Sequence, residues 1–486
     1  SWATIFGAQA GIGILPVALF GTDDQKSRYV PKLASAEWLG AYCLSEATSA
    51  SDALNCKTTA RLSAEGTHYI LNGTKMWVTN GGIADVYVVF AKVDGEKFTA
   101  FIVERTISGV SPGAEEHKMG IRGSSTTPLH LENAPVPVAN VLGEIGKGHL
   151  IAFNILNIGR LKLGAGCVGG CKHLLAKSLQ WAKEREAFGR RIADFGLIQE
   201  KLGEIVARTY AIESVSYRTA GMIDRLLAGI DQSGSEAPKQ ILEALAQYAV
   251  ECSIVKVLGT ESFDFVADET VQIFGGYGFS SDYEVERAYR DQRVHRIFEG
   301  TNEINRLLIT DMLLKRSLKG QLALIPAARR VVDEVLEGAV EEPAEDTPLS
   351  EETRLVEQSK KAFLLVAGSA VQKYMQALAE EQEIIGVLSN LVMEIYAMES
   401  ALLRTQKIVG HTPASECDAT RAYLYAAVDR MESDARRALA RIAEGDTLRT
   451  QLALLRRFLR RSSPDVIELR RRLAIRALEL NRYPFT

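Results

Sequence analysis

The sequence predicts an α+β fold in which N-terminal helices, a middle antiparallel β-domain, a helical bundle and an additional all-α C-terminal domain follow one another. Two observations predict this order. Hydrophobic residues recur at helical spacing up to about residue 40, alternate with a period of two from about 41 to 146, and return to a period of 3.6 from about 147 onward. The chain, at 486 residues, is also too long for one compact core, so several packing units are expected.

Residues 1–40 are expected to form the remainder of an N-terminal helical domain that is partly absent. The opening Ser1-Trp2-Ala3-Thr4 has no initiator Met and lacks the basic and apolar regions of a secretion signal. We therefore expect the chain to be the body of a longer protein. Apolar runs such as Gly7–Phe20 are interrupted by glycine, proline or polar residues, so no transmembrane helix is expected.

Residues 41–146 are predicted to form the antiparallel β-domain. The β-rich runs are Tyr69–Leu71, Val86–Ala91 and Thr99–Val103. The turn signals between them are Asn72-Gly73, Asn80-Gly81-Gly82 and Asp94-Gly95.

Residues 147–318 are predicted to form a helical bundle, because long amphipathic stretches are joined by short polar loops. These stretches are Ile151–Glu186, Gly196–Leu227, Ile241–Phe274 and Asn302–Leu318, with a connector at Asp231–Pro238. A linker is predicted at 319–349, where the segment Glu337–Pro348 is acidic and contains two prolines. Residues 350–486 are helical again and form the predicted C-terminal extension.

The composition and the cysteine spacing argue against a nucleic-acid-binding protein, a disulfide framework and a metal site. The residues are 47% hydrophobic and 24% charged with a net charge of -4, which gives no reason to expect a nucleic-acid partner. The six cysteines have no framework spacing, so they are interpreted as reduced thiols of an intracellular protein. Cys167 and Cys171 lie in a glycine-rich run that favours close helix packing. Only His173 is nearby as a further ligand, so no metal site is expected.

The segment Arg296-Ile-Phe-Glu-Gly-Thr-Asn-Glu-Ile-Asn-Arg306 offers a candidate base. Glu299 precedes a helical stretch, so it should lie on a loop. A carboxylate in an apolar cleft has a raised pKa, which suits a base that acts on a weak carbon acid. A helix-entry carboxylate at an N-terminus is the structural alternative.

Four motifs follow one another along the chain. They are Lys75-Met-Trp-Val-Thr-Asn-Gly81, Glu184-Arg-Glu-Ala-Phe-Gly-Arg190, Val271-Gln-Ile-Phe-Gly-Gly-Tyr-Gly-Phe279 followed by Tyr289-Arg-Asp-Gln-Arg293, and Phe298-Glu-Gly-Thr-Asn-Glu-Ile-Asn-Arg306. In this order they resemble the motifs of the acyl-CoA dehydrogenase family. Each alone is weak evidence, but four motifs in the right order over residues 1–316 make a specific match. The resemblance implies that Glu299 removes the α-proton of a fatty acyl thioester and that FAD accepts the β-hydride.

The resemblance also implies the binding residues. Arg185 is expected to pair with the pyrophosphate of the FAD of a neighbouring subunit. The implied cofactor residues are Leu44, Ser45, Trp77, Thr79, Arg185, Phe188, Gln272, Gly275, Gly276, Thr301 and Glu303. The implied substrate residues are Ser51, Asn157, Arg160 and Gly300. For Arg160 the alternative is a surface salt bridge, and for Trp77 it is a buried strand aromatic.

The first flavin loop departs from the family pattern. Family members commonly have Thr-Glu-Pro-x-x-Gly-Ser-Asp, whereas this chain has Ser45-Glu-Ala-Thr-Ser-Ala-Ser-Asp52. Ala47 in place of proline loosens the turn, and Ala50 in place of glycine is strained if its position requires positive φ.

The helical extension resembles the very-long-chain subgroup, which implies a homodimer that passes electrons to electron-transferring flavoprotein in the bacterial cytoplasm or the mitochondrial matrix. A scaffold for respiratory-complex assembly and an acyl-CoA oxidase remain as alternatives. The segments Leu454–Arg461 and Leu469–Arg476 alternate apolar residues with arginine. They fit either peripheral contact with anionic membranes, including the inner membrane, or packed bundle helices.

Overall fold

The structure is a computed structural model that describes residues 2–231, 234, 236–336, 349–408, 414–462 and 464–485. The chain forms two compact units. The first unit contains Ser1–Lys162, Met222–Cys252 and Ile297–Thr301. The second unit contains Leu163–Gly221, Ser253–Arg296 and Asn302–Thr486. The boundaries of these units do not coincide with those of the predicted segments, because the long helices of the central region contribute residues to both units.

The N-terminal part of the first unit is helical, as predicted. Its elements are α1 (Trp2–Ala8), the π-helical turn η1 (Gln9–Gly13), α2 (Leu15–Phe20) and α3 (Asp23–Ala34). The start of α3 is fixed by a capping box. The Gln25 backbone N–H donates to the Thr22 hydroxyl at 3.2 Å, and the Thr22 N–H donates to the Gln25 side chain at 3.0 Å.

Two segments of the described chain are long and apolar enough to cross a membrane by length and composition alone, although none was expected. They are Trp2–Phe20 and Gln382–Ile408. The first consists of three short elements near the N-terminus. The second is 61% buried inside the structure, as a core helix would be. Length and composition are therefore weak evidence for a membrane span here.

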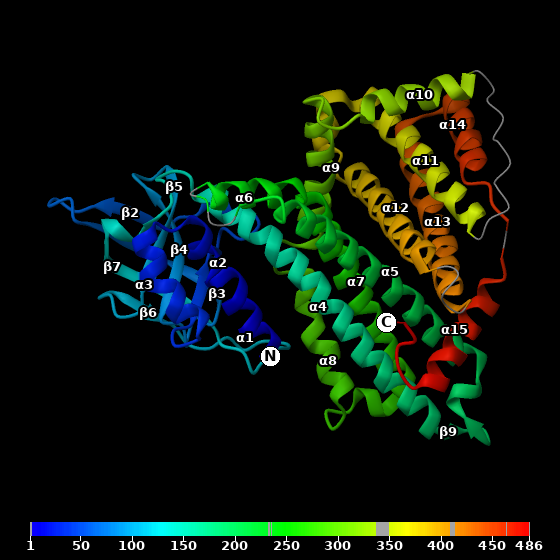
Figure 1. Cartoon of the computed structure of the whole chain (residues 1–486), viewed down its shortest axis with the longest axis horizontal. Coiled ribbons are helices and arrows are strands. Elements are labelled where there is room, and N and C mark those ends of the chain that lie inside the picture. The colour runs from blue at the N-terminus through cyan, green and yellow to red at the C-terminus, as the bar shows by residue number, and fades with distance from the viewer. Residues whose placement is uncertain are drawn as a thin grey trace. The chain divides into compact units, whose positions relative to one another are not determined.

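The middle of the chain forms one sheet of eight strands (Figure 1). The strands are β1 (Gly40–Cys43), β2 (Thr59–Leu62), β3 (His68–Thr79), β4 (Val86–Val93), β5 (Lys97–Glu104), β6 (Val110–Pro112), β7 (Thr126–Pro137) and β8 (Val141–Leu142). Their order is β6-β7-β3-β2-β4-β5-β8, and β1 also pairs with β4.

The sheet is not purely antiparallel, which corrects the sequence prediction. Strands β1 and β2 both pair with β4 in parallel. The β2–β3 hairpin lies between β1 and β4 in the sequence, so the chain crosses over before β4 and runs in the same direction as β1. Asn72-Gly73 is also no turn: β3 continues through it with a register shift between Leu71 and Gly73.

Both faces of the sheet are buried within the first unit. One face is a core of strand residues such as Leu71, Val89 and Phe101. On the other face, α2 and α3 contribute Val17 and Tyr29, and these helices lie against the sheet in Figure 1. Burial of large side chains on both faces makes this sheet a rigid platform for the loops that leave it.

The second unit is helical, apart from a short hairpin of β9 (Glu186–Ala187) and β10 (Arg190–Arg191). The central helices are α4 (Gly148–Glu184), α5 (Gly196–Leu227), α6 (Ala237–Gln247), α7 (Ala249–Phe274), α8 (Glu284–Gln292) and α9 (Asn302–Leu318). Of these, α6 belongs wholly to the first unit, and α4, α5 and α7 contribute residues to both units. The glycine-rich run around Cys167 serves close packing. A Cβ on Gly164 would lie 2.4 Å from Val255, and one on Gly170 would lie 2.6 Å from Phe263.

Two predictions about this region need correction. The stretch predicted as one helix over Ile241–Phe274 is broken at Tyr248, whose ψ of 19° leaves helical geometry. The predicted linker 319–349 contains the helix α10 (Leu324–Leu336), because apolar residues recur there at helical spacing. Residues 337–348 of that linker, and residues 232, 233 and 235 of the predicted connector, lie outside the described residues.

The C-terminal extension consists of α11 (Ser350–Tyr374), α12 (Gln382–Ile408), α13 (Ser415–Ile442), α14 (Gly445–Phe458) and α15 (Val466–Leu480). Most apolar side chains of its arginine-rich segments are packed inside: Leu455, Phe458, Leu469 and Leu473 are buried, whereas Ile475 is exposed. Arg470 pairs with Glu204 at 2.6 Å and Arg472 with Asp418 at 2.7 Å. These contacts favour the packed-helix alternative over a membrane-facing surface.

Candidate active site

Glu299 lies on the bend between the 3-10 turn η6 (Arg293–Arg296) and α9, where the sequence places it. Its φ is 60°, and the φ of the following Gly300 is 77°. A non-glycine residue in the left-handed region is strained by about 1–2 kcal/mol, and such strain is concentrated at functional sites. The backbone around Glu299 is therefore held by its surroundings in a conformation that the isolated segment disfavours.

The helix α4 leaves room for the Glu299 carboxylate by having a glycine beside it. A Cβ built on Gly159 would lie 2.6 Å from Glu299 Oε2 and 2.9 Å from Oε1. Real Cβ atoms do not approach other atoms this closely, so any side chain at position 159 would displace the carboxylate. Gly159 is a site residue that the sequence analysis missed. It directly precedes Arg160, which the family motif does mark.

Arg160 holds the backbone of the same loop. Its Nε donates to the Glu299 carbonyl oxygen at 3.1 Å, and its Nη1 donates to Asn157 Oδ1 at 3.1 Å. Arg160 is 4% exposed and Asn157 is 6% exposed. The surface salt-bridge alternative for Arg160 is therefore wrong. Contact of Arg160 with the CoA portion stays a prediction. The burial of Arg160 leaves little of its guanidinium group accessible to a ligand.

The electrostatic surroundings of Glu299 combine burial with positive charge. Burial lowers the pKa of Arg160, and the Glu299 charge acts against this shift. Burial likewise lowers the pKa of Lys162, again opposed by Glu299. On β1, burial raises the pKa of the Tyr42 hydroxyl, and the Glu299 charge adds to that rise. The carboxylate thus faces two basic side chains of α4 and a neutral phenol.

The predicted flavin residues of the first unit gather at the ends of β1 and β3. Leu44 and Ser45 directly follow β1, and the Met76 N–H of β3 donates to the Ser45 carbonyl oxygen at 2.9 Å. Trp77 has a φ of 59° and is 56% exposed. The buried-aromatic alternative for Trp77 is therefore wrong. Thr79 is half-buried at the end of the same strand, and Thr301 is half-buried after Gly300.

A buried ion pair that the sequence analysis missed holds the Leu44–Ser45 segment. The Lys75 ammonium lies 2.7 Å from Glu46 Oε1, with the two side chains 0% and 5% exposed, and it also donates to the Leu44 carbonyl oxygen at 3.3 Å. Burial acts to raise the pKa of Glu46, but hydrogen bonds from Lys75, Thr58 and the Lys57 N–H outweigh it and lower the pKa. Lys75 and Glu46 both lie within the quoted motif segments, which was the available signal.

The altered first flavin loop is not strained at Ala50. Ala50 is absent from the non-glycine residues with positive φ in the described part of the chain. The condition for strain at this position, a positive φ, is therefore not met, and the backbone there does not need glycine. Ala47 and Ser51 are both exposed, so this part of the loop is accessible.

The remaining predicted cofactor residues lie in the second unit. A cavity of about 590 Å³ is lined by Arg185, Gly275, Gly276 and the aromatic residues Trp181 and Tyr277, among others. Gly275 has a φ of 63°, and a Cβ on either glycine would meet no atom within 4 Å. The other members are exposed: Phe188, which is 95% exposed with a φ of 53°, Gln272 and Glu303.

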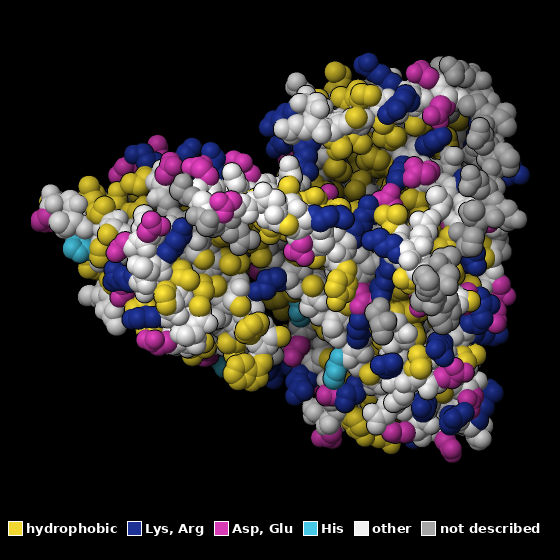
Figure 2. Space-filling model, in the orientation of Figure 1, with side chains coloured by type: hydrophobic (Ala, Val, Ile, Leu, Met, Phe, Trp, Pro, Cys, Tyr) yellow, Lys and Arg dark blue, Asp and Glu magenta, His cyan; other side chains and the backbone are white. Residues whose placement is uncertain are grey.

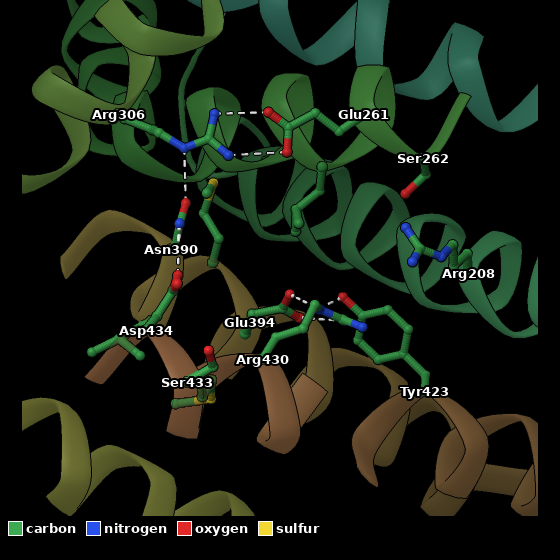
Figure 3. Close-up of a pocket in the computed structure, with 14 residues that line it drawn as sticks. Arg208, Glu261, Ser262, Arg306, Asn390, Glu394, Tyr423, Arg430, Ser433 and Asp434 are labelled. Atoms are coloured by element: carbon green, nitrogen blue, oxygen red, sulfur yellow. Dashed lines mark hydrogen bonds and ion pairs between the residues drawn. The ribbon is translucent and has the colours of Figure 1, made fainter. Parts of the chain in front are cut away.

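Two other cavities of the second unit lack the chemistry of the site. One of about 320 Å³ is lined by charged side chains that pair with one another: Arg306 binds Glu261 at 2.7 Å and Arg430 binds Glu394 at 2.7 Å (Figure 3). One of about 910 Å³ lies among α9, α10, α11, α12 and α14 and opens as an apolar hollow below α10 (Figure 2). Its lining is mainly apolar and includes Arg329 but no carboxylate, so it offers no base for the α-proton.

Models of the acyl-CoA dehydrogenase family match most of the chain. The N-terminal domain model matches residues 1–37 and the middle domain model matches 41–134. Two different C-terminal domain models match 146–314 and 358–457. The last match covers much of the helical extension, so the extension also has family counterparts.

Individual relatives agree with the family models. A probable acyl-CoA dehydrogenase of Bacillus subtilis is 47% identical over 99% of this chain and 82% of that protein. The mitochondrial very long-chain specific acyl-CoA dehydrogenase of Bos taurus is 36% identical over 84% of this chain, which spans 64% of that relative's length.

A crystal structure of an acyl-CoA dehydrogenase complexed with FAD from Bacillus anthracis has the same fold. It superposes with a TM-score of 0.97 at 48% identity and covers 99% of this chain and 83% of that chain. The extent and identity of these matches agree with the Glu299 loop and the motifs described above. The chain belongs to the acyl-CoA dehydrogenase family.

Proposed function

We propose that this chain oxidises long-chain fatty acyl-CoA to trans-2-enoyl-CoA in fatty acid β-oxidation and that electron-transferring flavoprotein receives the electrons. The observation that carries the reaction type is the Glu299 carboxylate, held on a strained loop against Gly159. Long-chain specificity is supported by the helical extension, which a family model matches over 358–457, and by similarity to very long-chain specific relatives. Relatives from bacteria and mitochondria support an intracellular enzyme.

Enzymes of this family depend on FAD, and the residues present fit that cofactor. In the first unit Trp77 presents an exposed aromatic face beside Ser45 and Thr79. In the second unit Arg185 makes no salt bridge with any described residue and lies at a cavity whose glycines leave their surroundings open. The planar guanidinium lies over the Tyr277 ring at 5.6 Å from its centroid, and a guanidinium without a carboxylate partner suits the oxygens of a pyrophosphate.

The chain's own residues provide the acid–base part of the reaction. Oxidation removes one proton from the α-carbon and one hydride from the β-carbon, and a double bond forms between them. When bound, FAD supplies the hydride acceptor. The Glu299 carboxylate takes the α-proton, and the Glu299 backbone N–H donates to the thioester carbonyl oxygen, where enolate-like charge develops. Arg160 holds the loop that carries both groups.

A chain-length series tests the substrate proposal. Dehydrogenation of saturated acyl-CoA esters from C4 to C20 is followed with an artificial electron acceptor, and kcat/KM is expected to rise toward the long chains. A maximum at C4 to C8 would contradict long-chain specificity. Repeating the series with electron-transferring flavoprotein and with oxygen as acceptors identifies the partner, since peroxide production would indicate an oxidase instead.

The flavin spectrum tests whether the chain acts as an enzyme at all. The purified protein is expected to bind FAD with about one flavin per chain. A colourless protein that cannot be reconstituted with FAD would overturn the enzyme proposal in favour of a scaffold.

We expect Arg185→Ala to release flavin and to weaken a homodimer together, because the guanidinium is proposed to bind a FAD phosphate across the subunit interface. Flavin content is measured by absorbance after gel filtration, and subunit association by sedimentation. Arg191→Ala is the matched control, since Arg191 is exposed in the same hairpin and pairs with Asp194 at 3.2 Å within the chain. Unchanged flavin content in Arg185→Ala would refute this role.

A further inference from the structure

Lys162 is a half-buried lysine that the motifs do not assign, and it lies one helical turn beyond Gly159 on α4. Residues at positions i and i+3 share a face of an α-helix, so Lys162 is on the face that contacts the Glu299 carboxylate through Gly159. This face of α4 therefore presents a basic side chain next to the space occupied by the candidate base.

The N-terminal turn η1 makes room for the Lys162 ammonium. A Cβ on Gly11 would lie 3.1 Å from Lys162 Nζ. Gly11 itself is buried, so the end of the lysine side chain reaches into the interior of the first unit. Two glycines thus shape this region: Gly159 leaves space for the carboxylate, and Gly11 leaves space for the ammonium.

No salt bridge joins Lys162 to a carboxylate in the part of the chain that the structure describes. A partly buried lysine without a structural ion pair costs stability, and such residues are concentrated at functional sites. Burial lowers the pKa of Lys162. The negative charge of Glu299 opposes this shift, because it stabilises the ammonium form of Lys162. The interaction is reciprocal, so the ammonium also favours the ionised form of Glu299.

The other titratable groups around Glu299 and Arg160 act differently. Arg160 donates to the Glu299 backbone oxygen and to Asn157, so its hydrogen bonds orient the loop rather than the carboxylate. Cys252 lies beside Arg160, and burial raises the pKa of its thiol to about 12, so it carries no charge. Tyr42 of β1 is also neutral, because burial raises the pKa of its hydroxyl.

We propose that Lys162 is a positioning residue whose ammonium keeps Glu299 ionised, so that the base is ready to accept the α-proton at neutral pH. The inference rests on the proposed role of Glu299 as the base. A carboxylate in a pocket that an acyl chain also enters would otherwise be protonated by desolvation. Lys162, whose ammonium lies beside Gly11, offsets that effect.

The test compares the pH dependence of kcat/KM for the FAD-loaded wild-type enzyme and Lys162→Met with palmitoyl-CoA and an artificial acceptor. In Lys162→Met the acidic limb is expected to move to higher pH by about one pH unit, the lower end of the effect of a nearby opposite charge. The plateau of kcat/KM at high pH is expected to be retained in this variant. Lys162→Arg is expected to restore the wild-type limb. Lys97→Met, which removes an exposed lysine of β5, is the matched control.

An infrared titration of the same holoproteins gives a readout without turnover. The band of the protonated carboxyl that disappears in Glu299→Gln reports Glu299 directly, and it is expected to persist to higher pH in Lys162→Met. An unchanged limb and band would overturn the proposal, and so would an equal loss of activity at all pH values with the band unmoved, which indicates a packing role. If the wild-type enzyme were inactive but the Glu299 carboxyl band still persisted to higher pH in Lys162→Met, the proposed function would be refuted and the inference supported.

Discussion

Glu299→Gln is expected to lower the rate of acyl-CoA dehydrogenation by about 10²–10⁴-fold, the usual cost of losing a general base. The amide is nearly isosteric with the carboxylate, so the strained loop and its hydrogen bond from Arg160 are retained. The amide of the Gln variant, however, cannot accept the α-proton. Flavin binding is expected to be unchanged, because the carboxylate has no proposed contact with the cofactor.

The measurement is the single-turnover rate of flavin bleaching by a long-chain acyl-CoA under anaerobic conditions. Glu96→Gln is the control, since Glu96 is exposed in the turn between β4 and β5. Flavin absorbance and the thermal unfolding midpoint show whether the variant is folded and loaded. A Gln variant that kept more than about a tenth of the wild-type rate would show that Glu299 is not the base.

Gly159→Ala is expected to lower kcat by about 10–10²-fold, with folding largely retained. The added methyl would lie 2.6 Å from Glu299 Oε2, so the carboxylate must move away from its position. A displacement of about 1 Å can cost about 10²-fold in rate when it affects a reacting group. Alanine is also a better helix former than glycine by about 1 kcal/mol, so α4 itself gains stability.

Gly166→Ala is the matched control for this substitution. It lies on the same helix, and a Cβ there would meet no atom within 4 Å. Activity is therefore expected to be unchanged, and the unfolding midpoint to be equal or higher. If Gly159→Ala retained the full wild-type kcat, the carboxylate position would not matter for the reaction, and Gly159 would be no more than a helix residue.

Much of the fold could be predicted from periodicity, because the spacing of apolar residues within a helix or strand is a local property of the sequence. The bounds of α5 and α9 agree with the predicted stretches Gly196–Leu227 and Asn302–Leu318, where the apolar face is continuous. The break at Tyr248 was missed because no glycine or proline marks it. The parallel pairing of β1 with β4 was missed because strand direction depends on the crossover between them and not on either strand.

The candidate site was predicted where single residues carry a motif and missed where two distant segments meet. Glu299 and Trp77 stand out in the sequence. Gly159 lies 140 positions before Glu299, and nothing local shows that its missing side chain admits a carboxylate. The pairing of Lys75 with Glu46 depends in the same way on strands that are adjacent only after folding.

The left-handed backbone at Trp77 and Glu299 has a consequence for engineering this protein. Glycine adopts this conformation without strain, so replacement by glycine would relieve backbone strain at both positions. Each such replacement would also remove an aromatic face or a base. A variant library should therefore hold these two positions fixed, and improvements in durability should be sought at residues such as Gly166, where the backbone is helical and the surroundings are open.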